Sequence, residues 1–297
     1  MSLTPRERVQ LVVWRRGIEL GSVARTAARG LEMRGLGVTT HAYGPHRLEQ
    51  LDRIAAPSAA GDAPILVYVH GGGWVCGVRS LYRCDLAPFA RAGHVVFNLD
   101  YPLAPEAPFP RALESVIRAL AWIREREPGA ERVALAGDSA GGNLVTMAAA
   151  VLTNPALFEL VDPALADLTL PEIDKVVSIY GVMDRFTWLE HRFPAARLFM
   201  TCYGGAAAYE REVRPDNCLT PLDLTFQHLP PIFVVAAGRD PLCVSSQIFH
   251  QALASRGFPV RYQLYPDEAH GFLNMPWRKA SHRLKRDMLA FLASAPA

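Results

Sequence analysis

Short apolar runs alternate with longer helical patterns over most of the chain. Six runs have the length and the Val, Ile and Leu content of buried strands: residues 65–69, 94–99, 133–136, 176–180, 232–236 and 260–265. Helical patterns lie between or after them, at residues 81–92, 111–126, 140–152, 245–256 and 278–292. Strands that alternate with helices pair in parallel. The chain is therefore predicted to be an α/β protein whose mostly parallel central sheet is flanked by helices on both faces.

The alternation is absent from two segments. Thr4-Pro5-Arg6-Glu7 has the form of a helix start, and one or two helices are predicted to run to about residue 33. Two further strands are predicted at residues 38–43 and 48–54. Residues 184–225 are rich in aromatics and prolines, which is typical of a lid inserted over the carboxyl edge of a sheet. Whether these aromatic residues line a pocket or only pack stays open at this point.

These segments divide the chain into four parts. Residues 1–37 are predicted to be N-terminal helices that contribute to a cap, and residues 184–225 the cap or lid insertion. Residues 38–183 and 226–297 are predicted to be the first and second parts of the core.

Charge and hydropathy exclude several classes of partner. The sequence has 31 Lys and Arg against 29 Asp and Glu, a net charge of +2, which is too small for phosphate-backbone binding. The longest uncharged stretch, residues 139–158, contains Asn143, Asn154 and Pro155, so it is interpreted as a buried helix rather than a membrane span. We expect no nucleic-acid partner and no integral membrane segment.

The cysteines indicate a reducing compartment. There are five, at positions 76, 84, 202, 218 and 243, and none forms a C-x-x-C pair. This odd and dispersed set argues against both a disulfide framework and a structural zinc site. No apolar secretory segment follows Arg15-Arg16. A cytoplasmic location is predicted, and no metal site is expected because no cluster of His and Cys ligands is present.

Gly137-Asp138-Ser139-Ala140-Gly141 is the first motif that carries chemistry. It is a G-x-S-x-G sequence between an apolar strand and a helical pattern, the context of a nucleophile elbow. Small flanking residues let the chain turn tightly and hold the Ser139 hydroxyl above the sheet, and the following helix N-terminus favours negative charge. A glycine turn without chemical meaning is the alternative, and a second motif is needed to decide.

That second motif, His70-Gly71-Gly72-Gly73-Trp74, directly follows the strand at residues 65–69. Its glycines let backbone N–H groups approach a substrate carbonyl. Gly72 and Gly73, together with the Ala140 N–H, are therefore candidates for an oxyanion hole. A phosphate loop is the alternative, but neither a Walker A motif nor G-x-G-x-x-G is completed here.

With these two motifs the sequence resembles the hormone-sensitive-lipase-like branch of the α/β-hydrolase family. The run at residues 100–110, Asp-Tyr-Pro-Leu-Ala-Pro-Glu-Ala-Pro-Phe-Pro, is close to that branch's D-Y-R-L-A-P-E-x-P-F-P, and Asp240-Pro-Leu and His270-Gly-Phe also match. The resemblance covers roughly residue 65 to the C-terminus. It implies an α/β-hydrolase fold with a helical cap. It also implies a serine hydrolase, often a homodimer, that needs no cofactor.

Asp240 and His270 complete a candidate catalytic triad with Ser139. The three follow the order Ser, acid, His that is usual on this fold. Asp240 lies just beyond the strand at residues 232–236 and His270 in a loop beyond the strand at residues 260–265, so both reach the edge of the sheet that carries Ser139. Asp184 also follows a strand, but it precedes the insertion and is assigned a structural role. Asp138 is interpreted as a structural residue whose hydrogen bonds shape the site.

Pro102 departs from the family pattern, because the branch has an arginine there. A salt bridge expected of that loop is therefore predicted to be missing. The entry segment at residues 43–54 faintly resembles feruloyl-esterase-like and formamidase-like hydrolases, so a formamidase-like substrate is kept as an alternative.

We conclude from the sequence that the chain is a serine carboxylic-ester hydrolase. The expected partner is a small-molecule ester with an apolar acyl or aryl group, because the lid is aromatic and the net charge near zero. Two alternatives remain. One is an arylformamidase-like amide hydrolase that uses the same triad, and the other is a non-catalytic small-molecule receptor on the same fold. Receptors of this kind resemble the family but have lost the histidine, and here His270 is present.

Overall fold

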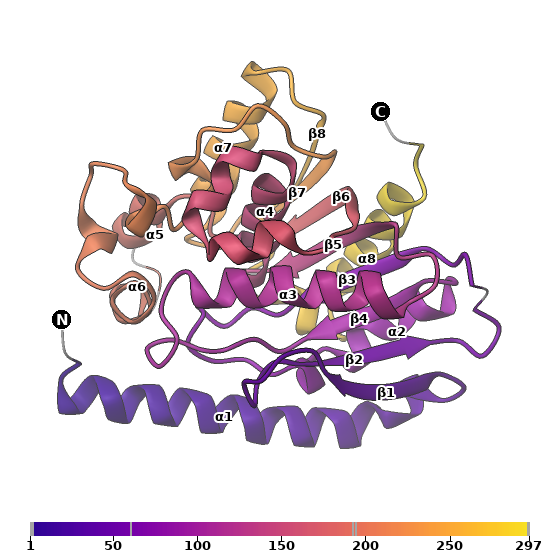
Figure 1. Ribbon diagram of the computed structural model, residues 1–297. Coiled ribbons are helices and arrows are strands. Elements are labelled where there is room, and N and C mark those ends of the chain that lie inside the picture. Colours follow the sequence, from indigo (N-terminus) through magenta and orange to yellow (C-terminus); the bar gives the residue numbers. More distant parts are fainter. Residues whose placement is uncertain (1–2, 60, 192, 194, 296–297) are drawn as a thin grey trace.

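The computed structural model describes residues 3–59, 61–191, 193 and 195–295. Its central layer, within these residues, is one eight-stranded sheet in the order β1-β2-β4-β3-β5-β6-β7-β8 (Figure 1). β1 and β2 pair in antiparallel fashion, β2 is antiparallel to β4, and the other neighbours are parallel. The strands are β1 Gly37–Ala42, β2 Gln50–Ala55, β3 Ile65–Val69, β4 Val95–Leu99, β5 Arg132–Asp138, β6 Glu172–Ile179, β7 Ile232–Ala237 and β8 Val260–Tyr265.

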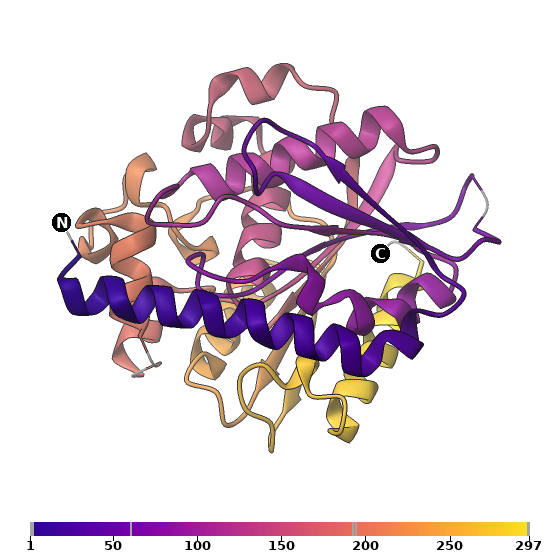
Figure 2. The same cartoon turned by 90° about the horizontal axis from the view of Figure 1, so that it is seen from below.

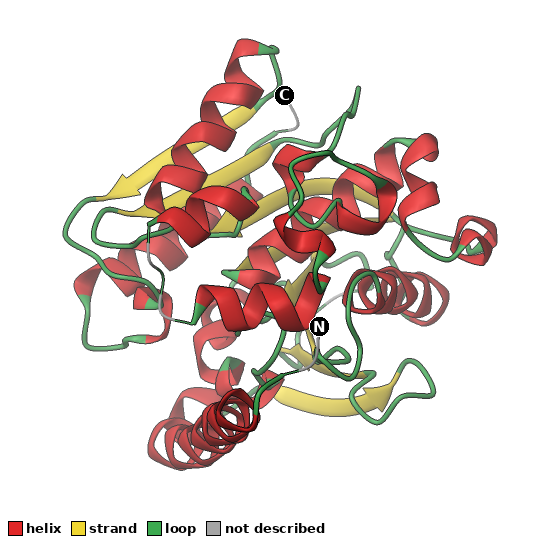
Figure 3. Cartoon of the chain, turned by 90° about the vertical axis from the view of Figure 1, so that its left-hand side faces the viewer, coloured by secondary structure: helices red, strands yellow, loops and turns green. Residues whose placement is uncertain are grey.

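Helices cover both faces of this sheet (Figure 3). They are α1 Pro5–Arg29, α2 Arg83–Arg91, α3 Arg111–Arg126, α4 Ala140–Thr153, α5 Arg185–Glu190, α6 Ala196–Gly204, α7 Cys243–Ser255 and α8 Lys279–Leu292. Short 3₁₀ helices add Gly30–Met33, Arg79–Leu81, Pro155–Leu160, Pro163–Asp167, Ala207–Tyr209, Pro215–Asn217, Pro221–Asp223 and Phe272–Asn274.

Each face of the sheet has its own hydrophobic core. Residues of α3, α4 and α7 pack on one face, and residues of α2 and α8 pack on the other. Successive side chains of β3 alternate between the two cores, with Val67 in the first and Tyr68 in the second. The predicted α/β class is confirmed, with its mostly parallel sheet between two helical layers.

Most predicted elements are present within a few residues of their expected ends. The main difference is β6, which begins at Glu172, four positions before the predicted start at residue 176. Its first residues, Glu-Ile-Asp-Lys, include three charged side chains and so lack the apolar pattern of a buried strand. Lys175 is nevertheless buried, because its ammonium group donates hydrogen bonds to the carbonyl oxygens of Leu292, at the end of α8, and Ser294, just after it.

The uncharged stretch at residues 139–158 contains the predicted buried helix, α4, nearly all of whose side chains are inside the protein, and ends in the 3₁₀ helix Pro155–Leu160. None of the helices in the described part of the chain combines the length and the apolar character needed to cross a bilayer.

The N-terminal helix α1 begins with the predicted capping box. The Thr4 hydroxyl accepts a hydrogen bond from the Glu7 N–H, and the Glu7 carboxylate accepts one from the Thr4 N–H. The helix runs across the whole molecule on the side that faces the viewer in Figure 2. Near its other end, Arg25 and Arg29 both form ion pairs with the buried Asp85 of α2. Helix α1 is therefore anchored to the core by charge as well as by packing.

Helices α5 and α6 lie within the segment at residues 184–225 and gather at one end of the molecule (Figure 1). The rings of Trp14 on α1 and Phe199 on α6 meet edge to face, with centroids 5.2 Å apart. The N-terminal helix and this segment thus contact each other, although they are far apart in the sequence.

Candidate active site

Ser139 stands on a sharp turn between β5 and α4. Its backbone angles are φ 53° and ψ −120°, which L-residues seldom adopt. The turn needs small residues on both sides. A Cβ atom on Gly137 would lie 2.4 Å from the Gly141 carbonyl oxygen, and a Cβ atom on Gly141 would lie 2.0 Å from that of Val69. The two motif glycines therefore make room for the turn that carries the serine.

The structure brings Ser139, His270 and Asp240 together in one chain of hydrogen bonds. The Nε2 atom of His270 lies 3.0 Å from the Ser139 Oγ, and its Nδ1 atom lies 2.6 Å from an Asp240 carboxylate oxygen. The other Asp240 oxygen accepts a hydrogen bond from the Leu242 N–H, at 2.9 Å. Asp240 is buried, and the His270 side chain is about a quarter exposed, at 24%. The imidazole can thus exchange a proton with the hydroxyl while the carboxylate fixes its orientation.

The glycine loop after β3 lies against this turn. A Cβ atom on Gly71 would lie 3.1 Å from the Ser139 Cβ. Gly72 has φ +125°, where a side chain would be strained, and its Cβ would also lie 2.1 Å from the Cys76 carbonyl oxygen. The N–H groups of Gly72, Gly73 and Ala140 have no hydrogen-bond partner among the residues that the structure describes. They are available to a ligand at this position.

Asp138 joins the glycine loop to the serine turn. One oxygen of its buried carboxylate accepts hydrogen bonds from the Gly71 N–H at 2.9 Å and from the Tyr68 hydroxyl at 2.8 Å. The other accepts one from the Tyr82 hydroxyl, at 3.1 Å. Burial raises the pKa of Asp138, and the Tyr68 and Gly71 donors oppose that rise. The carboxylate therefore fixes where the loop begins, as the sequence predicted in general terms.

His70 forms a second support beneath the loop. Its ring stacks on Tyr101, with centroids 4.5 Å apart, and its Nδ1 atom lies 2.7 Å from the Gly71 carbonyl oxygen. The Tyr101 hydroxyl donates to the His70 carbonyl oxygen at 3.0 Å. Burial raises the pKa of Asp100, but hydrogen bonds from His70 and Arg79 outweigh burial and lower it below its usual value.

Arg15 of α1 holds the loop in which Pro102 replaces the family's arginine. Its guanidinium group forms a bidentate ion pair with Glu106, at 2.8 and 2.7 Å, and donates to the carbonyl oxygens of Val75 and Ala104. The loop is thus held by a different salt bridge, from an arginine some 90 positions away in the sequence and not from position 102. This ion pair could not be predicted, because no motif near Arg15 points to Glu106.

A cavity of about 220 Å³ opens over Ser139 and His270. Its walls are mostly apolar, and they come from several separate parts of the chain, including residues 81–82, 270–271 and 274. Helix α1 contributes Trp14 and Ile18, the glycine loop contributes Gly72, Gly73 and Cys76, and the segment at residues 184–225 contributes Trp188, Phe193 and Phe199.

Some aromatic residues of the segment at residues 184–225 line the cavity, and others only pack behind it. Trp188, Phe193 and Phe199 line the cavity, and the Phe193 ring meets the His270 ring at 4.9 Å. Tyr203 instead packs flat against Trp74, with centroids 4.2 Å apart, and supports the wall from behind. Trp14 and Ile18 could not be assigned to the cavity from sequence, because only the course of α1 brings them there.

The cysteines near the site are poor nucleophiles. Burial raises the pKa of the Cys76 thiol to about 12, and its Sγ donates to the Gly72 carbonyl oxygen at 3.1 Å. All five cysteines are free. Within the described residues, no group of three or more His, Cys, Asp and Glu side chains is arranged to hold a metal ion.

Three other carboxylates that lie near the site or follow a strand contact other groups than His270. Asp184 caps the N-terminus of α5, where it accepts a hydrogen bond from the Thr187 N–H at 2.7 Å. Glu268 pairs with Arg278, and Asp267 is mostly exposed beside Arg239. These carboxylates have structural or surface roles in the structure.

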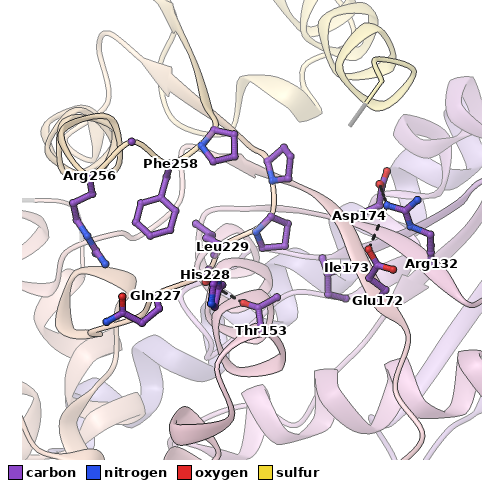
Figure 4. A pocket seen from close by; sticks show the side chains of 14 residues that line it. Arg132, Thr153, Glu172, Ile173, Asp174, Gln227, His228, Leu229, Arg256 and Phe258 are labelled. Atoms are coloured by element: carbon purple, nitrogen blue, oxygen red, sulfur yellow. Dashed lines mark hydrogen bonds and ion pairs between the residues drawn. The ribbon is translucent and has the colours of Figure 1, made fainter. Parts of the chain in front are cut away.

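A wider groove of about 530 Å³ lies at the opposite edge of the sheet (Figure 4). Arg132 and Glu172 begin β5 and β6 there, whereas Ser139 follows the other end of β5. Arg132 pairs with Glu172 and Asp174, and the Thr153 hydroxyl donates to the His228 carbonyl oxygen (Figure 4). Among the described residues that line this groove, none pairs a nucleophile with a base as Ser139 and His270 do.

Comparison with known proteins identifies the family. Residues 66–274 match a family described by its alpha/beta hydrolase fold. The chain belongs to the α/β-hydrolase family. The matched range contains Ser139, Asp240, His270 and the glycine loop. The resemblance to the hormone-sensitive-lipase-like branch is thereby confirmed.

Individual relatives are esterases by name. The chain is 30% identical over 233 residues to Carboxylesterase NlhH of Mycobacterium tuberculosis, covering 73% of this chain and 69% of that protein. It is 29% identical over 240 residues to an acetyl esterase of Salmonella schwarzengrund, covering 75% and 69%. Among solved structures it is similar to Esterase B of Lactobacillus rhamnosis, with a TM-score of 0.79, 19% identity and coverage of 97% and 96%. This last similarity shows the fold alone.

Proposed function

We propose that this α/β hydrolase cleaves small to medium apolar acyl or aryl esters through a Ser139-His270-Asp240 triad and an acyl-enzyme intermediate. That it is an enzyme of the carboxylesterase type follows from its family and its relatives. The observation that carries the finer proposal is the continuous hydrogen-bonded chain from Asp240 through His270 to Ser139, at the floor of an apolar cavity.

In the first half of the reaction, Ser139 attacks the ester carbonyl carbon. His270 Nε2 takes the hydroxyl proton as the Oγ–C bond forms, and then gives it to the departing alcohol oxygen. Asp240 accepts the Nδ1 proton in a hydrogen bond, which keeps Nε2 free to act as the base and stabilises the imidazolium ion. In the second half, His270 activates water, which releases the acid from Ser139.

The oxyanion is held by backbone N–H groups. Those of Gly72, Gly73 and Ala140 are without partners in the described structure, and Ala140 is the first residue of α4, where the helix dipole also favours negative charge. Asp138 holds the glycine loop in place from below. Loss of one oxyanion donor in such sites costs on the order of 10²–10³ in kcat.

The cavity determines which ester fits. Its volume of about 220 Å³ is below the roughly 300–1,000 Å³ of pockets for drug-sized ligands, and above the roughly 150 Å³ of an apolar cavity that takes up benzene. A short acyl chain or a single aromatic ring matches this space. The apolar lining offers no charged partner to a phosphate or carboxylate substituent on that group.

We also propose that residues 1–37 and 184–225 form the cap, while residues 38–183 and 226–297 form the catalytic core. The contact between Trp14 and Phe199 over the cavity supports this division. A cytoplasmic location is proposed from the five free cysteines.

The deciding experiment measures release of p-nitrophenol from acyl esters of increasing chain length. Wild type should show a burst of acylation and steady turnover, with an optimum at short chains, and Ser139→Ala should lose both. Ser255→Ala, which removes a hydroxyl from the exposed surface, is the matched control and should keep full activity. Full activity in Ser139→Ala would refute the triad. A silent wild type that hydrolyses formanilides would instead support the formamidase alternative.

A further inference from the structure

Helix α1 presents an apolar stripe to solvent. Val9, Val12, Val13, Leu20 and Val23 are exposed by 63%, 56%, 62%, 71% and 70%. Scattered exposed hydrophobic residues are normal on a protein surface, but five on one face of a single helix are not, even though the charged Arg16 lies among them. We name this row the outer stripe of α1.

Helical geometry places the outer stripe on one face. Spacings of three, four and seven residues relate its members, so their side chains lie along the same side of the helix. The opposite side carries Leu11 and Ser22, which are buried, and Ile18, which lines the cavity. Seen from below, α1 lies in front of the rest of the chain (Figure 2). The outer stripe therefore faces away from the protein.

We propose that the outer stripe docks this protein onto an anionic lipid surface. A helix that lies in the interface plane buries an apolar face among acyl chains and keeps arginines at the headgroups. Helix α1 has this composition on its outer side. Arg6, Arg8 and Arg16 are exposed around the stripe, against Glu19, which pairs with Arg16 at 2.9 Å. The other three arginines of the helix face inward and pair with Glu106 and Asp85, so they do not contribute to this surface.

A second copy of the chain is the other candidate occupant, and the size of the stripe disfavours it. A stable protein interface takes about 20–30 residues a side, and the outer stripe offers five large side chains on a single helix. A lipid surface has no such requirement, because affinity grows with each apolar group inserted and with each arginine at an anionic surface.

Trp277 extends the same argument. It is 75% exposed, the most open tryptophan that the structure describes, and it lies in the loop just before α8. Three residues before it, the Asn274 carbonyl oxygen accepts a hydrogen bond from Arg25 of α1, so this loop is attached to the helix. Tryptophan is the side chain favoured at the boundary between acyl chains and headgroups.

Docking would place the cavity beside the membrane. Trp14 and Ile18 line the cavity from the inner side of the helix whose outer side carries the stripe. An ester dissolved in the lipid would then need to travel only around α1 to reach Ser139. This consequence rests on the proposed esterase function, whereas docking itself does not.

The experiment is cosedimentation with vesicles of phosphatidylcholine alone and of phosphatidylcholine with about a third phosphatidylglycerol. Wild type should sediment with the anionic vesicles and be released by high salt. Leu20→Glu/Val23→Glu should lower the partition coefficient at least about tenfold, because two apolar contacts become charges. The matched control, Leu168→Glu/Val213→Glu, changes the same residue types at exposed positions elsewhere and should bind like wild type.

Two further measurements separate the outcomes. Ser139→Ala should bind vesicles like wild type, so a failure of the esterase proposal leaves docking testable. Turnover of a water-soluble acetate ester should be the same in wild type and in Leu20→Glu/Val23→Glu, which shows that the variant is folded. The proposal is overturned if wild type stays in the supernatant with both kinds of vesicle, or if the stripe variant binds like wild type. A wild-type dimer in light scattering that the stripe variant converts to monomer would also overturn it, in favour of a second copy.

Discussion

We predict that Asp85 makes the largest single electrostatic contribution to holding α1 against the core. Its carboxylate is 1% exposed and contacts three cations from three parts of the chain. Arg25 lies 2.5 Å from one oxygen, while Arg29 and Lys285 lie 3.0 and 2.8 Å from the other. Replacing Asp85 by Asn keeps the shape and removes the charge that all three share.

The loss in the free energy of unfolding depends on which cation the substitution leaves without a partner. Arg29 keeps a second partner, Glu32, at 2.6 Å, and the side chains of Arg25 and Arg29 retain 15% and 12% exposure. Lys285 is only 6% exposed and has no other carboxylate among the described residues. Removing one partner of a buried pair costs about 3–5 kcal/mol. We expect Asp85→Asn to lose about 3 kcal/mol, the lower end, because only one of the three cations is fully enclosed.

Urea unfolding measures this loss, and limited trypsin digestion reports whether α1 detaches first. Asp267→Asn is the control, since its ion pair with Arg239 is exposed and should change stability by at most about 1 kcal/mol. A double-mutant cycle of Asp85→Asn with Lys285→Met should show a coupling of at least about 1 kcal/mol, because the two groups are in contact. Asp85→Asn within about 0.5 kcal/mol of wild type would refute the reasoning.

Three other predictions follow from the site and the core. Asp138→Asn should lower kcat by roughly ten- to a hundredfold with little change in KM, because the Asp138 carboxylate positions Gly71 and not the substrate. Steady-state kinetics in which the control Asp267→Asn loses as much activity would contradict this. Phe199→Ala should shift the chain-length optimum toward longer acyl groups, because the ring closes the cavity against Gly73, and an unchanged profile would place the limit elsewhere. Burial lowers the pKa of His94 in the folded protein, so the unfolded chain takes up this proton first. The contribution of neutral His94 to the free energy of unfolding should therefore be lost as pH falls below about 6.5, the pKa of an unfolded histidine. In urea unfolding at pH 7 and pH 5, His94→Gln should lose less stability than wild type between the two values.

The sheet and the position of the site could be predicted because their determinants are local. A buried parallel strand is a short apolar run, and the turn at Ser139 is specified by the glycines two residues before and after it. Asp240 and His270 could be placed near Ser139 because each directly follows a strand of the same parallel sheet. The start of β6 was missed for the opposite reason. Lys175 enters the interior only because α8 ends where its ammonium group can reach two carbonyl oxygens.

The cavity walls could not be predicted, because they depend on contacts between distant segments. Arg15 and Trp14 are neighbours on α1, and their partners, Glu106 and Phe199, lie some 90 and 185 positions away. No local pattern records either pairing. The capping box predicted where α1 begins, but only the folded chain shows where the helix lies against the core.

These long-range contacts suggest that α1 links stability, pocket shape and surface attachment. Its inner side bonds to the carbonyl oxygens of Val75 and Ala104 through Arg15, and lines the cavity through Trp14. Its far end is fixed by the ion pairs with Asp85. A change at Asp85 should therefore alter ester selectivity without touching the triad. A change on the outer stripe, such as at Leu20, should alter attachment to lipid without altering selectivity for soluble esters. The two faces of this helix are thus proposed to have separable roles, and the paired substitutions measure these roles independently.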